Sequence, residues 1–184
     1  MTALVLIDIQ KGLQEMVFYG TERNNPNAEE NCGRLLTFFR AKQMPVFHVK
    51  HNSTNADSPL HPSKTGNDFH SAVQPLENEP IFEKNVNSAF IGTELETRLK
   101  TQNITHLVIA GLTIEHCIST SVRMAANLGF QVTLVSDATA AFDKIGIDGN
   151  RYSADIIYQT EMANLQDEFA AIKCTSTLLE ELDN

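Results

Sequence analysis

Short, unbroken apolar runs recur along this chain, and they limit the folds that it can adopt. The first run, Ala3–Ile7, has no polar residue, which is typical of a parallel strand buried on both faces. We expect five further strands, at Pro45–Val49, Ile81–Lys84, His106–Ala110, Phe130–Val135 and Phe169–Cys174. Helical segments alternate with the strands, at Pro26–Phe39, Thr93–Lys100, Cys117–Leu128, Ser153–Leu165 and the acidic C-terminus. This alternation predicts an α/β fold: a three-layer, doubly wound sandwich with a six-stranded parallel sheet.

The length of the chain predicts one domain over residues 1–184, because no repeat, linker or low-complexity tract divides it. Residues 52–78 are rich in Ser, Asn, Pro and His and predict a single long loop. A loop of that length in a compact domain usually carries function or forms a lid.

Charge and cysteine content exclude several classes of partner. The formal net charge is -9 with no basic block, which argues against nucleic-acid binding. The three cysteines form no C-x-x-C, so neither a disulfide framework nor a zinc ribbon is expected. The start of the chain has no basic region and no cleavage site, and Asp8 interrupts its apolar run. We therefore expect no membrane segment and a cytoplasmic location.

Three reactive side chains fall at or just after the carboxyl ends of predicted strands. Asp8 follows the first strand, Lys84 closes the third, and Cys117 lies shortly after the fourth. In a doubly wound sheet this edge is where ligands bind. We therefore expect the three side chains to meet at one site.

Each residue type has a chemical role at such a site. We expect Lys84 and the start of a helix to lower the pKa of the Cys117 thiol and so to favour the nucleophilic thiolate. Asp8 can accept the thiol proton and pass it to a leaving group. Backbone N–H groups between Gly111 and Cys117 can form an oxyanion hole. Taken singly, however, such an Asp is more often a cap or ion-pair partner, and such a Cys a small core residue.

Several separated segments resemble the isochorismatase-like cysteine hydrolases, the superfamily that includes nicotinamidases. They are LVLIDIQ at the start of the chain, EKNVNSAFIGTELETRL around Lys84, LVIAGLTIEHCISTSVRMAANLGFQVTLVSDATAAF around Cys117, and DGNRYSADIIYQ. The resemblance implies a six-stranded parallel sheet and a catalytic triad of Asp8, Lys84 and Cys117. It also implies a cis peptide between Leu112 and Thr113, which would aim the Thr113 N–H beside that of Cys117 as the oxyanion hole.

The sequence departs from nicotinamidases at their metal site. Their Asp-x-His after the second strand is absent from HVKHNSTNADSPLHP. His48 and His51 are three apart on and just beyond a predicted strand, where side chains point to opposite faces. We therefore expect no metal and no other cofactor.

The substrate pocket is predicted less directly. We expect substrate contacts from Gln10, Phe18, His51, Ser88, Phe90 and His116. His51 lies where the chain leaves the sheet, and His116 directly precedes the nucleophile. For the phenylalanines, plain core packing is the commoner role.

The favoured function is hydrolysis of a C–N (amide-type) bond in a small molecule through a thioester on Cys117. Hydrolysis of a vinyl ether such as isochorismate is the alternative within the superfamily, and it does not need the cysteine. A catalytically idle binding or assembly module is the alternative from another class. The resemblance also implies a homodimer or homotetramer.

Overall fold

The computed structural model describes residues 1–183 and contains the predicted parallel sheet. Its six strands lie in the order β3-β2-β1-β4-β5-β8. The strand bounds are β1 Thr2–Ile7, β2 Val46–His51, β3 Ile81–Lys84, β4 His106–Gly111, β5 Gln131–Val135 and β8 Ala171–Lys173. The predicted fold class is therefore confirmed, although the sixth strand is shorter than its apolar run.

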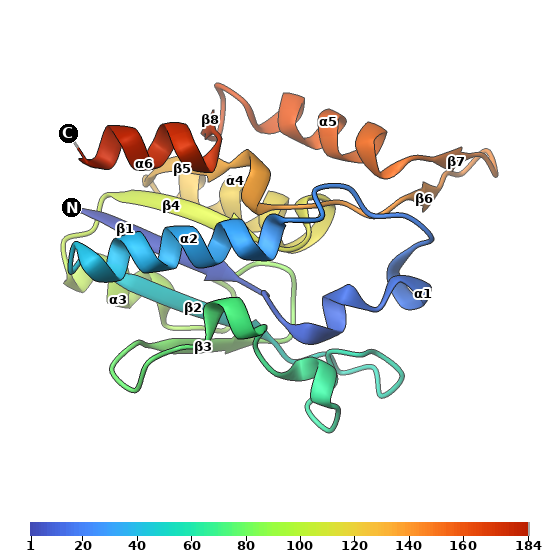
Figure 1. Cartoon of the computed structure of the whole chain (residues 1–184), viewed down its shortest axis with the longest axis horizontal. Coiled ribbons are helices and arrows are strands. Elements are labelled where there is room, and N and C mark those ends of the chain that lie inside the picture. The colour runs from blue at the N-terminus through green and yellow to red at the C-terminus, as the bar shows by residue number, and fades with distance from the viewer. Residues whose placement is uncertain (184) are drawn as a thin grey trace.

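Helices cover both faces of the sheet (Figure 1). Their bounds are α1 Met16–Tyr19, α2 Ala28–Ala41, α3 Leu95–Thr101, α4 Ser119–Asn127, α5 Ala154–Leu165 and α6 Thr175–Asp183. Short 3-10 turns lie at Lys11–Gln14, Thr65–Asn67, Ser71–Val73 and Ser136–Ala138. None of the helices in residues 1–183 combines the length and the apolar character that a membrane span requires.

Alternating residues of the central strand serve two separate cores. Val5 and Ile7 of β1 pack in the cluster that contains the buried residues of α3, α4 and α5. Leu4 and Leu6 point to the other face, where α2 and α6 cover them. Both faces of β1 are apolar because both are buried, which explains its unbroken apolar sequence.

The strand order reverses at the centre of the sheet, between β1 and β4. These strands pair in parallel up to Ile7 and Gly111. Gly111 has a φ of +138°, and a Cβ at this position would lie 1.9 Å from the Ile7 carbonyl oxygen. Only glycine therefore lets the end of β4 approach β1 this closely.

The chain after β4 differs from the predicted single helix starting at Cys117. A π-helical turn, η4 (Ile114–Ile118), comes first, and α4 follows from Ser119. The Ile118 N–H donates to the Thr113 carbonyl five residues back at 3.2 Å. Apolar periodicity carries no signal for such a wide turn.

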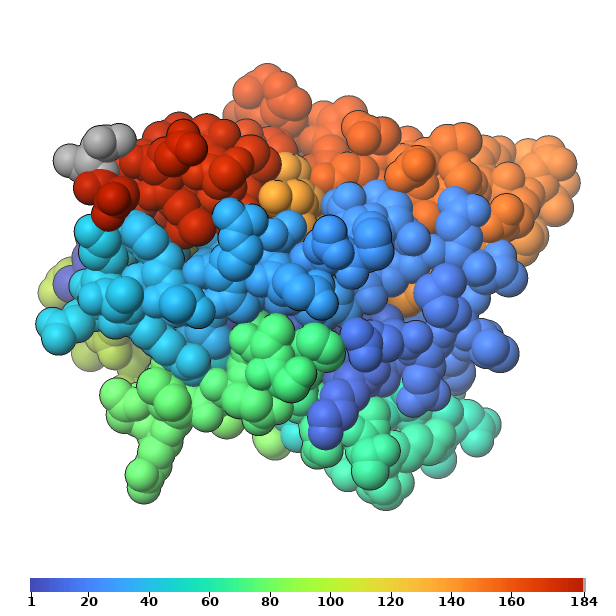
Figure 2. Space-filling view, viewed as in Figure 1, coloured from blue at the N-terminus to red at the C-terminus, as the bar shows by residue number. Residues whose placement is uncertain are grey.

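Two other segments add detail that the sequence did not predict. A small antiparallel hairpin, β6 (Lys144–Ile145) with β7 (Arg151–Tyr152), precedes α5. The long loop after β2 lies under the N-terminal segment, as Figure 2 shows along the lower edge of the molecule. There the Lys11 N–H donates to the Asp68 carbonyl at 2.9 Å, so the loop is held against the start of the chain.

Candidate active site

The carboxyl ends of four neighbouring strands bring four reactive side chains together. Asp8 directly follows β1, His51 ends β2, Lys84 ends β3, and Cys117 lies in η4 after β4. This edge lies where the strand order reverses, which is the usual ligand site of doubly wound sheets.

The Lys84 ammonium is the centre of the group. Its Nζ lies 2.5 Å from Asp8 Oδ2, 3.1 Å from His51 Nδ1 and 3.3 Å from Cys117 Sγ. The Lys84 side chain is fully buried. An ammonium has three N–H groups, so each has one acceptor here, and the lysine is oriented from three sides.

Asp8 keeps one oxygen available for chemistry. Oδ2 accepts from Lys84, whereas Oδ1 is buried and has no hydrogen-bond partner within residues 1–183. A carboxylate oxygen of Asp8, a ring nitrogen of His51 and Cys117 Sγ all lie within 4.8 Å of one another. The carboxylate is therefore near enough to exchange a proton with the thiol after a small movement.

The expected lowering of the Cys117 pKa was wrong. Burial raises the pKa of the Cys117 thiol well above its usual range, and the negative charge of Asp8 raises it further. Lys84 acts in the opposite direction but does not prevail. The physical reason is that the Lys84 charge is already balanced by Asp8 at 2.5 Å, so little net positive potential reaches the sulfur. Cys117 is therefore a thiol at rest.

The backbone beside Cys117 offers a free donor. The peptide bond between Leu112 and Thr113 is cis, the geometry that the family resemblance implies at this position. The Ile114 N–H donates to the Ala140 carbonyl at 2.9 Å, but within residues 1–183 the Thr113 N–H has no acceptor. Thr113 and Cys117 both line the same cavity. A substrate oxyanion bound there could accept from Thr113.

A cavity of about 330 Å³ opens over this group. Its lining residues are Asp8, Leu13, Tyr19, His51, Ser58, Leu60, Asn87, Leu112, Thr113, Glu115, His116 and Cys117. The volume suits a small molecule, and the lining combines leucines with convergent polar groups. Of the six residues predicted to contact substrate, His51 and His116 line this cavity.

Gln10 has a structural position instead of the predicted substrate contact. It is fully buried, and its amide is used within the protein. Gln10 Oε1 accepts from the His51 N–H at 2.9 Å, while Nε2 donates to the carbonyls of His51 at 3.0 Å and Asn67 at 2.8 Å. Gln10 therefore fixes His51 from behind and has no polar atom left for a substrate.

Three other predicted contacts also lie away from the cavity lining. Phe18 is exposed and packs edge-on against Tyr19, which lines the cavity in its place. Ser88 Oγ accepts from the Phe90 N–H at 3.2 Å. Phe90 stacks on Phe130 in the core. These positions correct the predicted pocket, because each side chain is directed to packing or local hydrogen bonding.

Several residues that line the cavity could not be recognised from sequence patterns. Tyr19, Ser58 and Glu115 were not predicted. Tyr19 ends the short helix α1 and Ser58 lies in the long loop, and tertiary packing brings both to the cavity. Asn87 also lines the cavity, and its Oδ1 lies 3.8 Å from Cys117 Sγ. Glu115 is two residues before Cys117. Both lie in the π-helical turn η4, which the sequence did not predict, and both line the cavity.

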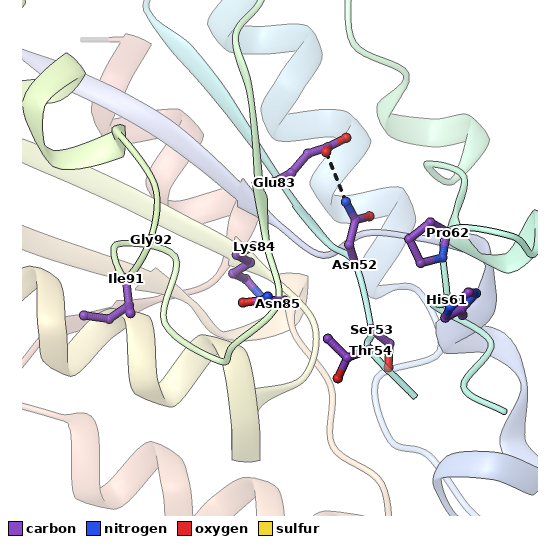
Figure 3. A pocket seen from close by; sticks show the side chains of 10 residues that line it. All are labelled: Asn52, Ser53, Thr54, His61, Pro62, Glu83, Lys84, Asn85, Ile91 and Gly92. Carbon is purple, nitrogen blue, oxygen red and sulfur yellow. Dashed lines mark hydrogen bonds between the residues drawn. The ribbon is translucent and has the colours of Figure 1, made fainter. Parts of the chain in front are cut away.

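A second cavity, of about 540 Å³, lies between the long loop and the segment after β3 (Figure 3). Asn52, Ser53 and Thr54 line one side, and Ile91 and Gly92 line the other. Asn52 Nδ2 donates to Glu83 Oε2 at 3.1 Å and ties the two sides together. Because the Lys84 side chain is fully buried, only its backbone can border this space.

The possible metal ligands are already bound to a cation. Asp8, His51 and Cys117 are the one group in residues 1–183 whose donor atoms gather closely enough for a metal ion. The Lys84 ammonium contacts all three, so a metal would have to displace it. His48 points elsewhere and pairs with Glu79 at 2.8 Å, as the alternation of a strand requires.

Comparison with known proteins adds an independent finding. The Isochorismatase domain family matches residues 2–175. The isochorismatase family protein YrdC from Bacillus subtilis (strain 168) is 43% identical over 177 residues, which cover 96% of this chain and 94% of YrdC. A crystal structure from Chromobacterium violaceum, assigned to the same family, has a TM-score of 0.95 and 37% identity over 100% of this chain and 94% of that one. N-carbamoylsarcosine amidase from Arthrobacter sp is 24% identical over 170 residues, which cover 83% of this chain and 60% of the amidase.

Proposed function

This chain belongs to the isochorismatase family of hydrolases, and from that membership we propose that it hydrolyses a C–N (amide-type) bond of a small molecule through a thioester on Cys117. The observation that carries the proposal is the bridging position of Lys84, 2.5 Å from Asp8 and 3.3 Å from Cys117, two residues that line one cavity. The amidase relative supports the choice of bond, because its name states amide hydrolysis.

The first half of the reaction acylates the cysteine. The Cys117 thiol gives its proton to Asp8 Oδ1, the unpartnered oxygen, as the sulfur attacks the substrate carbonyl carbon. The carbonyl oxygen becomes negative and accepts hydrogen bonds from the N–H groups of Thr113 and Cys117. When the C–N bond breaks, Asp8 returns the proton to the leaving nitrogen. An amine departs, and the acyl group stays on sulfur as a thioester.

The second half reverses these roles with water. Asp8 takes a proton from a water molecule, which attacks the thioester carbonyl. The same N–H groups hold the second oxyanion. As the C–S bond breaks, the proton on Asp8 returns to sulfur, and the carboxylic acid leaves. Lys84 stays protonated throughout and stabilises the negative charge that moves between Asp8 and Cys117.

The raised pKa of Cys117 fits this sequence of steps. A buried thiol is protected from unspecific reaction while no substrate is bound. Transfer of its proton to Asp8 is coupled to attack, so a free thiolate is not required beforehand. In this mechanism the thiolate forms during attack, whereas a cysteine that is ionised at rest carries the negative charge before substrate binds.

The vinyl ether alternative fits the cavity less well. Isochorismate carries two carboxylates and would need cationic partners. None of the cavity-lining residues in the described part of the chain is a lysine or an arginine. The nearby Lys84 already has an acceptor for each of its three N–H groups. A neutral or cationic substrate meets no such mismatch. An idle binding module would not need the unpartnered Asp8 oxygen beside a thiol.

The test is a screen of small amides, ureides and vinyl ethers, with mass spectrometry of the intact protein during turnover. We expect release of amine and carboxylic acid from one amide class, and an added acyl mass on Cys117. Cys117→Ala should show neither. Cys174→Ala is the matched control, because Cys174 follows the edge strand β8 and does not line the cavity, and it should retain both. Turnover of a vinyl ether by Cys117→Ala would overturn the proposal.

A further inference from the structure

Glu115 has a carboxylate oxygen that the mechanism does not use. Its Oε1 accepts from the Phe142 N–H at 3.3 Å and lies 3.3 Å from Lys144 Nζ. Its Oε2 is buried and has no hydrogen-bond partner within residues 1–183. The side chain is 7% exposed and lines the catalytic cavity. A buried carboxylate oxygen without a donor is costly unless a ligand supplies one.

Tyr19 presents a second unused polar atom to the same cavity. Its hydroxyl is buried beside the Ser58 side chain, which acts to lower its pKa, but it makes no hydrogen bond of ordinary geometry within residues 1–183. Burial raises the pKa of Tyr19 to about 12, so the group is a neutral phenol that can accept or donate. The Tyr19 ring stacks on Phe142 with 5.4 Å between ring centroids. Phe142 therefore positions both groups: it stacks on Tyr19 and donates its N–H to Glu115.

The charges around the cavity favour a donor rather than an acceptor. Lys84 is fully used by its three acceptors, and Lys144 is paired with Glu115. Burial lowers the pKa of His51 and of His116, so both imidazoles are neutral at pH 7. Two carboxylate oxygens that line the cavity have no partner within residues 1–183, Asp8 Oδ1 and Glu115 Oε2. The proposed reaction uses Asp8 Oδ1 for proton transfer, which leaves Glu115 Oε2 for binding.

We propose that Glu115 and Tyr19 form a subsite for a nitrogen group with N–H donors, an ammonium or an amidine, on the small amide that the enzyme hydrolyses. Glu115 Oε2 accepts from this group, and the Tyr19 hydroxyl accepts a second hydrogen bond from it. The inference deepens the proposed function and rests on it for the identity of the reacting bond. A carboxylate at the same place would meet Glu115 and be repelled.

Binding to the Cys117→Ala protein tests the subsite without turnover. The probes are 3-aminopropanamide, butanamide and malonamate, which share an amide and differ at the other end: ammonium, methyl or carboxylate. Binding would be followed by chemical-shift titration of the labelled protein at pH 7. We expect 3-aminopropanamide to bind about tenfold tighter than butanamide, as hydrogen bonds to a charged group warrant. Malonamate should bind most weakly.

Two variants in the Cys117→Ala background separate recognition from structure. Glu115→Gln should reduce the preference for ammonium over methyl to about twofold or less, since it removes the charge. Lys144→Met removes the salt-bridge partner of Glu115 and should keep or increase the preference. If Lys144→Met lowers the preference as Glu115→Gln does, the pair is only structural and the inference is overturned. The same holds if the starting protein shows no preference.

Tyr19→Phe keeps the test decisive if Glu115→Gln does not fold. Removing only the hydroxyl should lower the ammonium preference about threefold, and an unchanged preference would overturn the inference. The test of the subsite can fail or succeed independently of the test of amide hydrolysis. Amide turnover without probe discrimination would remove the subsite and leave the reaction, whereas discrimination without turnover of any amide would remove the reaction and leave the subsite.

Discussion

The side-chain amide of Gln10 pairs with both backbone groups of His51, accepting from its N–H at 2.9 Å and donating to its carbonyl at 3.0 Å. His51 in turn accepts from Lys84 Nζ at 3.1 Å. A buried residue outside the cavity therefore sets the position of the central lysine through one intermediate.

Replacing Gln10 by Leu should lower the stability of the protein and the rate of the proposed hydrolysis. Three hydrogen bonds are lost and their backbone partners are left buried, which should lower the free energy of unfolding by about 2–4 kcal/mol. Urea denaturation measures this change. Gln14→Leu is the control, because Gln14 is exposed and its side chain hydrogen-bonds within residues 1–183 only to His70, at 3.2 Å. It should change stability by less than about 0.5 kcal/mol. Equal effects of the two substitutions would contradict the role of Gln10.

The buried Asp8–Lys84 pair should show strong coupling in stability. Lys84→Met leaves the Asp8 carboxylate buried and unpaired, at a cost of about 3–5 kcal/mol. Asp8→Asn combined with Lys84→Met should recover much of that loss, because no unpaired charge is then left buried. Chemical denaturation of the two single variants and the double variant gives the coupling. Lys100→Met, which breaks an exposed pair with Glu96, should cost less than about 1 kcal/mol.

Thiol reactivity should follow the pKa order of the cysteines and not their catalytic importance. The hydroxyls of Ser176 and Thr177, each 3.2 Å from the sulfur, lower the pKa of Cys174 to about 7. Burial raises the pKa of the Cys117 thiol. At pH 7.5 and without substrate, iodoacetamide should therefore modify Cys174 first, as peptide mass spectrometry would reveal. Faster alkylation of Cys117 would mean that its thiolate exists at rest.

The cluster of Glu79, Arg40 and His48 should make stability depend on pH in acid. Burial alone would raise the pKa of Glu79, but hydrogen bonds from Arg40, the Leu76 N–H and His48 lower it to about 2. The unfolded chain then binds more protons between about pH 5 and pH 2, so this stability is complete above pH 5 and is lost as the pH falls.

Glu79→Gln should therefore reduce the stability difference between pH 6 and pH 3 by about 1–2 kcal/mol, measured by urea denaturation. Glu77→Gln, at a neighbouring exposed position, is the control and should leave the difference unchanged. A pH dependence that survives Glu79→Gln would show that other carboxylates cause it.

The sheet and its catalytic edge were predictable because they depend on local signals. Apolar runs such as Ala3–Ile7 identify buried strands, and the topology of parallel sheets then places Asp8, Lys84 and Cys117 at one edge. The π turn at Ile114–Ile118 was not predictable, since a fifth-residue hydrogen bond leaves no periodic trace. Part of the cavity lining was missed for another reason: Tyr19, at the end of the short helix α1, and Ser58, in the long loop, reach the cavity only through tertiary contacts.

The protonation state of Cys117 shows a further limit. Lysine beside cysteine suggested a lowered pKa, but the outcome depends on the distance between Lys84 and Asp8, which the sequence does not contain. The predicted single domain, cytoplasmic location and homodimer or homotetramer stay predictions. Size-exclusion chromatography with light scattering would determine the oligomeric state.

The order of strands in the sheet also determines at which stage of folding the site is assembled. The shortest stretch of chain that holds all three proposed catalytic residues runs from Asp8 to Cys117, and it is complete only after β4 has docked beside β1. A fragment or a growing chain that ends before β4 has no nucleophile at all. The rate at which activity returns during refolding would therefore report how fast β4 docks beside β1, without the need for a spectroscopic signal.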